Sequence, residues 1–171
     1  MSCQRAWREE RGFTLIELLL VILIMGIVFA MASSSWFRAI ESRRVDTGTN
    51  RLAADLRHAH SRAINRLQPQ TVGLTAGSSK YTIGPTASSC SVNPANPGCS
   101  EADLDDFPGT NVVVVNTSAA ITFNSDGSAT LPGGAATLTR RVSSADGAPA
   151  HDITINAATS RVQVAPYVVR P

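Results

Sequence analysis

The stretch "RGFTLIE", Arg11–Glu17, stands directly before an apolar run, Leu18–Ala32, and together these segments decide the fold. A helix over the twenty residues from Phe13 to Ala32 would span about 30 Å at about 1.5 Å per residue, which is the thickness of one hydrocarbon core. We therefore predict a transmembrane helix. Its one carboxylate, Glu17, costs roughly 2.5 kcal/mol or more inside a membrane unless it is paired. Glu17 is thus a candidate functional residue.

The residues before the apolar run predict its orientation. Arg5, Arg8 and Arg11 lie on this side, together with two glutamates. Arginine-rich flanks remain in the cytoplasm, so the bulk of the chain is expected on the other side of the membrane. A removable secretory signal has a shorter apolar core that ends at a cleavage site, whereas this one continues into helix-forming sequence. A plain membrane anchor accounts for the length of the run but leaves Glu17 unexplained.

Helical periodicity continues beyond the membrane-length run. Apolar residues recur at steps of mostly three and four up to Leu67, and Pro69 blocks further helix. We predict one helix from about Phe13 to about Leu67, apolar all round in its first half and amphipathic in its second. The weak helix formers at Thr47–Asn50 predict a kink or a flexible link. The expected organisation is a leader at 1–12, a transmembrane helix at 13–36, its amphipathic continuation at 37–67 and a β-rich head at 68–171.

The rest of the chain reads as short strands separated by turns. A long stretch rich in Ser, Pro, Asn and Gly, Ser88–Pro108, is predicted to be a loop. Seven or eight strands after one helix indicate an α+β protein in which antiparallel sheets cover the apolar stripe of the helix. The expected strands are Thr71–Ala76, Lys80–Gly84, Val112–Val115, Ile121–Asn124, Ser128–Leu131, Ala136–Val142, His151–Asn156 and Arg161–Val169.

The cysteines favour an oxidising compartment. Cys90 and Cys99 are nine residues apart in the predicted loop, and Cys3 lies before the apolar run. The spacing matches no zinc site and no histidine lies nearby. A disulfide between Cys90 and Cys99 suits a location outside the cytoplasm. Two free thiols are the alternative.

No residue set in this sequence predicts catalysis, a metal ion or a cofactor, and an enzyme is not expected. His58 and His60 lie two apart on the predicted helix, on different faces, and are expected to be solvated. The acidic loop at 103–106 lacks the glycine and the terminal glutamate of an EF-hand. Arginines on the helix could contact lipid headgroups, other subunits or DNA. The candidate DNA contacts in the head are Arg140, Arg141, Arg161 and Arg170.

The motif "RGFTLIE" with its apolar run resembles the class III signal of type IV pilins and pseudopilins. The resemblance implies that a prepilin peptidase cuts between Gly12 and Phe13 and methylates the new N-terminus of Phe13. Glu17 is then the fifth residue of the mature chain, where the family keeps its glutamate. In a filament, the amine of Phe13 and the Glu17 carboxylate of a neighbouring subunit would neutralise each other in an apolar core, where each charge alone is expensive.

Three segments resemble the GspH/FimT group of minor pilins and pseudopilins: "LAADLRHAHSRAINR" (52–66), "ITFNSDGSATL" (121–131) and "DITINAATSRVQV" (152–164). The resemblance implies a pilin-like fold and a structural subunit of a type II secretion pseudopilus or a type IV pilus in the bacterial inner membrane. Its partners would be other pilins, the prepilin peptidase and membrane lipid. DNA uptake is the alternative function. The usual glycine before the closing arginine is Ser160 here, and of the Gly-Arg-x-Arg element of DNA-uptake members only Arg161 is present.

Overall fold

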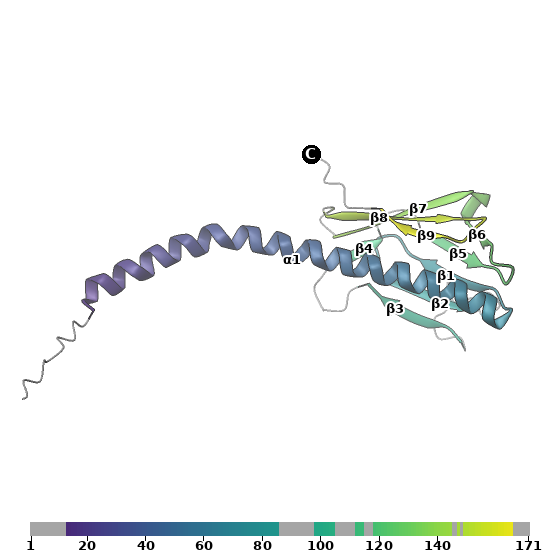
Figure 1. Cartoon of the computed structure of the whole chain (residues 1–171), viewed down its shortest axis with the longest axis horizontal. Helices are drawn as coiled ribbons and strands as arrows, with labels where there is room; N and C mark the ends of the chain where they lie inside the picture. The colour runs from purple at the N-terminus through teal and green to yellow at the C-terminus, as the bar shows by residue number, and fades with distance from the viewer. Residues whose placement is uncertain are drawn as a thin grey trace, which may run out of the picture. The chain divides into compact units, whose positions relative to one another are not determined.

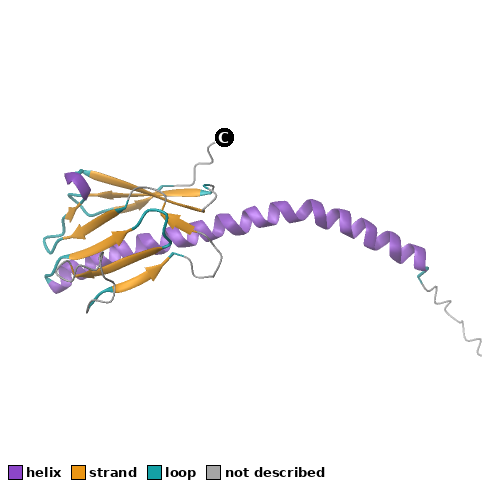
Figure 2. Cartoon of the chain, turned by 180° about the vertical axis from the view of Figure 1, so that it is seen from behind, coloured by secondary structure: helices purple, strands orange, loops and turns teal. Residues whose placement is uncertain are grey.

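The computed structural model describes residues 13–85, 98–104, 112–114, 118–144, 147 and 149–165. The chain divides into two compact units, residues 1–39 and residues 40–171. One long helix, α1 (Leu15–Arg66), belongs to both, and the strands all belong to the second unit (Figures 1 and 2). The predicted α+β class is confirmed. The first and last residues of the helix lie within two residues of the predicted bounds.

Both ends of α1 follow from local sequence. At its start, the Glu17 backbone N–H donates to the Thr14 hydroxyl oxygen at 3.3 Å, so Thr14 is the N-cap. At its end, Leu67 adopts a left-handed conformation with φ 51°. The N–H of Gln68 donates to the Ala63 carbonyl at 3.2 Å and that of Leu67 to the Ile64 carbonyl at 3.3 Å, which is a Schellman motif.

The second part of α1 packs on the sheets through small and aliphatic side chains. The predicted kink at Thr47–Asn50 is wrong, since these residues are regular helix. A Cβ atom on Gly48 would lie 3.1 Å from the Val112 side chain and 3.2 Å from the Leu104 carbonyl, so the glycine permits close approach of helix and head. Thr49 is buried, and its hydroxyl donates to the Val45 carbonyl at 2.6 Å.

Two antiparallel sheets form the head. The first has the order β3-β2-β1-β5-β6 and the second the order β4-β7-β8-β9. A short 3₁₀ turn, η2 (Pro132–Gly134), joins them between β6 and β7. The strands are β1 (Gln70–Leu74), β2 (Lys80–Pro85), β3 (Ser100–Asp103), β4 (Val112–Val114), β5 (Ala119–Phe123), β6 (Ala129–Thr130), β7 (Thr137–Ser144), β8 (Ala150–Asn156) and β9 (Val162–Val164).

Strand β3 corrects the prediction that 88–108 is a continuous loop. Its sequence, "SEAD", lacks the apolar alternation of a half-buried strand, and it pairs with β2 at the edge of the sheet. The contact that anchors it is polar, because Lys80 Nζ lies 2.7 Å from Glu101 Oε1. The other predicted strands are present with shifted ends, and the predicted extension of β9 to Val169 falls on residues outside those described.

One hydrophobic core joins the second part of α1 to both sheets. Alternating inward positions of the strands supply most of it, as expected for sheets with one face covered. The largest fully buried apolar side chains in this cluster are Tyr81, Phe123, Leu52, Leu56, Ile121, Ile153 and Ile155.

Candidate functional site

The first turn of α1 carries the predicted assembly residue. Thr14 and Glu17 occupy the N-cap and N3 positions, the spacing of a capping box. The carboxylate of Glu17 has no hydrogen bond or ion pair with any residue in the described part of the chain. A negative side chain at this position also favours the positive end of the helix dipole. The capping contact that the structure shows is that of the Thr14 hydroxyl, which sequence reasoning missed although Thr-x-x-Glu signals a helix start.

The helix behind Glu17 is exposed on every side. Leu15–Ala32 is long and apolar enough to cross a membrane, and none of this segment is buried by the rest of the protein. Phe13 is 81% exposed, and Gly12 lies outside the described residues. This surface therefore has to be covered by lipid or by other protein chains.

Four apolar side chains, two from the end of this segment and two from the turn of helix after it, line a hollow of about 420 Å³. Trp36 and Phe37 are about 70% exposed. Large aromatic side chains at the end of a membrane-length helix are typical of the interface between hydrocarbon and headgroups. The lining residues are Phe29, Ala32, Trp36 and Phe37.

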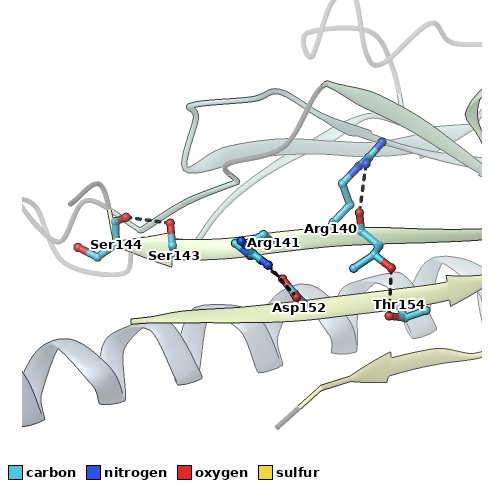
Figure 3. A network of polar contacts seen from close by, with 7 residues as sticks. Arg140, Arg141, Ser143, Ser144, Asp152 and Thr154 are labelled. Atoms are coloured by element: carbon cyan, nitrogen blue, oxygen red, sulfur yellow. Dashed lines mark hydrogen bonds and ion pairs between the residues drawn. The ribbon is translucent and has the colours of Figure 1, made fainter. Parts of the chain in front are cut away.

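The candidate DNA contacts do not converge. Arg141 forms two hydrogen bonds with the Asp152 carboxylate of β8, at 2.8 and 3.1 Å, so its charge is already paired (Figure 3). Arg140, the preceding residue on β7, points to the opposite face, because side chains alternate along a strand (Figure 3). Burial lowers the pKa of Arg140. Arg161 is exposed, and Arg170 lies outside the described residues.

Arg161 instead lies beside the helix arginine Arg57. Both line an open groove of about 900 Å³ between α1 and the hairpin of β8 and β9. Arg57 Nη2 donates to the Val162 carbonyl at 3.1 Å. His60 also lines this groove, with Nε2 3.3 Å from the Gly127 carbonyl oxygen. Sequence reasoning missed the groove, because the pairing of helix and hairpin is set by tertiary packing.

His60 also corrects the expectation that both helix histidines are solvated. His58 is exposed as predicted, but His60 is half-buried and its ring lies 5.7 Å from that of Phe123, centroid to centroid. The two-residue spacing did place them on different faces, and the hidden face is the one that meets β5.

Ser160 occupies a position that suits glycine. Its φ is 50°, in the left-handed region that side chains disfavour. The hydroxyl of Ser160 donates to the Gly127 carbonyl at 2.7 Å, which offsets part of the strain by tying the β8–β9 turn to the β5–β6 turn.

Cys99 is disulfide-bonded. Cys90 lies outside the described residues, so its pairing with Cys99 stays a prediction. No group of three or more His, Cys, Asp or Glu side chains that could hold a metal ion occurs among the residues that the structure describes.

Comparisons with known proteins agree with this fold. The prokaryotic N-terminal methylation motif matches residues 7–33. The crystal structure of the type IV minor pilin FimU from Pseudomonas aeruginosa (strain PAO1) is similar, with a TM-score of 0.50 and 20% sequence identity over 74% of this chain and 91% of that one. No curated protein matches the sequence. Residues 48–159, more than half of the chain, match the family of type II transport protein GspH, and the chain therefore belongs to the GspH family of pilin-like proteins.

Proposed function

We propose that this protein is a minor pilin or pseudopilin that is cut between Gly12 and Phe13, methylated on Phe13 and built into a filament from the bacterial inner membrane. It serves as a structural subunit in filament assembly, in a type II secretion machine or a type IV pilus. Its N-terminal helix packs among the helices of other subunits, and its head contacts other minor subunits or cargo. Genes neighbouring its own would distinguish the two machines.

One observation carries this proposal: a fully exposed apolar segment begins with a single carboxylate that has no side-chain partner in the described part of the chain. Cleavage would create a positive amine at Phe13, four residues away from Glu17. Packed helices would bring the amine of one subunit to the Glu17 of another, and pairing offsets the cost of both charges in an apolar interior.

The test replaces Glu17 in the full chain and separates processing from assembly. Glu17→Ala should still lose residues 1–12, seen as a smaller protein, yet its amount in sheared filaments should fall about tenfold or more, because the Phe13 amine is then left buried without a partner, at a cost of roughly 3 kcal/mol. Glu17→Asp, which keeps the charge, should retain part of the incorporation.

Thr14→Ala is the matched control for the capping role. It removes the N-cap hydroxyl but keeps the Glu17 charge, and it should assemble nearly normally. Normal incorporation of Glu17→Ala contradicts the pairing role. Equal defects in Thr14→Ala and Glu17→Ala would instead assign Glu17 to helix capping.

DNA uptake receives less support as a function. Arg141 is paired with Asp152 and Arg140 lies on the opposite face, which leaves Arg161 as the exposed member of the set among the described residues. Phosphate binding draws on several clustered cations, and the groove brings Arg161 together with Arg57 and His60 but with neither Arg140 nor Arg141. A gel-shift experiment with the head should therefore show little salt-sensitive retardation, and strong retardation that Arg161→Ala and Arg140→Ala abolish would favour a DNA receptor.

A further inference from the structure

Edge strands of a sheet expose unpaired backbone groups. In the described part of the head, three of the four sheet edges are protected. The edge of β4 is covered by a turn, because Gly77 N–H donates to the Val114 carbonyl at 2.8 Å and Val114 N–H to the Ser78 carbonyl at 3.2 Å. The edge of β6 is covered at Ala129, whose N–H donates to the Ala157 carbonyl at 2.8 Å. Strand β3 carries two acidic residues, which discourage pairing with another strand.

The fourth edge, β9, is open with respect to the residues that the structure describes. Arg161 and Ala165 direct their backbone groups toward β8, since Arg161 C=O accepts from Asn156 N–H at 3.2 Å and Ala165 N–H donates to Asp152 C=O at 2.7 Å. Backbone groups alternate in direction along a strand, so those of Val162 and Val164 point outward. Of these, the Val162 carbonyl accepts from Arg57, and no other described residue pairs with this edge.

The groove beside β9 is positively charged. Arg57 and Arg161 line it together with His60, and none of its lining residues is acidic. Neither arginine forms an ion pair with a carboxylate in the part of the chain that the structure describes. An open backbone edge next to guanidinium groups that have no carboxylate partner among the described residues is complementary to an extended chain that carries carboxylates.

We propose that the outer edge of β9 binds an extended acidic segment of a partner protein, which adds to the second sheet as a further strand. The partner's backbone would accept from Val164 N–H and donate to Val164 C=O. Its carboxylates would pair with Arg161 and Arg57. This edge belongs to the folded head, so binding does not depend on incorporation into a filament.

The test uses the full chain in detergent and a fluorescent peptide of alternating Val and Glu, about eight residues long, a common strand length. Anisotropy should show binding. Arg161→Glu should weaken it about tenfold or more, because an attraction becomes a repulsion. Arg141→Gln is the matched control, since Arg141 is already paired outside the groove, and it should change affinity less than about twofold.

A second arm tests the backbone pairing. Val164→Pro removes an outward N–H that pairs with no described residue, so the head should fold while peptide affinity falls about fivefold or more, the value of one lost hydrogen bond. If Val164→Pro does not fold, the strand pairing is tested instead with the wild-type protein and a peptide that is N-methylated on alternate residues. This peptide cannot donate a backbone hydrogen bond to the edge of β9, so it should bind more weakly than the unmethylated peptide.

Several results would overturn the inference. If a peptide of alternating Val and Lys binds equally well, charge complementarity with the arginines does not explain binding. If the N-methylated peptide binds equally well, the peptide does not pair with β9 as a strand. Unchanged peptide affinity in a folded Val164→Pro protein would lead to the same conclusion. Duplex DNA that binds where the acidic peptide does not would show that the groove is a nucleic-acid surface instead.

Discussion

The two parts of the continuous helix α1 differ in where their apolar side chains are buried. The first, Leu15–Ala32, is apolar on all faces after Glu17 and buries none of its surface in the protein. The second, Ile40–Arg66, hides one stripe against two sheets and exposes the rest. The first part therefore depends on lipid or other chains for its burial, whereas the second is satisfied by its own head.

The carboxylates of the two parts differ in the same way. Glu17 has no side-chain partner among the described residues, whereas Asp55 accepts a hydrogen bond from the Tyr81 hydroxyl of β2. Asp55 fixes the helix to its own sheet. Glu17 is the residue to which the proposed function assigns an intermolecular contact. Under the proposed function, a carboxylate serves folding where the fold supplies a partner, as for Asp55, and serves assembly where the described residues supply none, as for Glu17.

Removing leucine side chains should separate the two parts most clearly. Leu56 is 1% exposed and Leu23 is 60% exposed. Leu56→Ala should lower the free energy of unfolding of the head by about 3 kcal/mol, because it leaves a cavity in the core. Leu23→Ala should leave it unchanged, as followed by urea unfolding of the full chain in detergent. Equal effects would mean that the two parts of the helix are not energetically separate.

The two helix glycines give the next largest contrast. Gly48 lies against Val112 and Leu104, whereas nothing lies within 4 Å of a Cβ atom on Gly26. Gly48→Leu should destabilise the head by about 2 kcal/mol through overpacking. Gly26→Leu should leave the unfolding curve of the head in place. A stable Gly48→Leu protein would show that helix and head can move apart at little cost.

The Tyr81 contact should give the smallest effect. Burial raises the pKa of Tyr81 well above its usual range, and the hydrogen bond to Asp55 raises it further. Tyr81→Phe should cost about 1 kcal/mol at neutral pH. Because the neutral phenol is favoured in the fold, its contribution is complete below pH about 10, the pKa of free tyrosine, and is lost as the pH rises toward the folded value.

Absorbance titration of the phenols checks this pH dependence. The sequence has two tyrosines, and Tyr167→Phe leaves Tyr81 as the one that ionises. Its transition should lie above pH about 10 in the folded chain and return to the usual value in urea. Alkaline loss of stability should be weaker in Tyr81→Phe than in wild type. A normal ionisation of Tyr81 in the folded chain would contradict the buried contact.

Local patterns were sufficient for much of the fold. The length of the apolar run, the spacing of Leu52 and Leu56 and the block at Pro69 predicted the helix because each acts within one or two turns. Strand β3 was missed because its residues are polar and its pairing with β2 comes from distant sequence. The role of Gly48 was missed because a glycine reads as a weak helix former until the neighbouring side chains are placed.

The candidate sites also differ in whether local sequence or tertiary structure identified them. Sequence alone determined the apolar helix, its carboxylate and the resemblance at Gly12 and Phe13, since these depend on residues adjacent in the chain. Only the tertiary structure paired Arg141 with Asp152, turned Arg140 to the other face and brought Arg57 beside Arg161 across an open strand edge. Contacts between distant segments depend on strand register and helix packing, which no local pattern specifies.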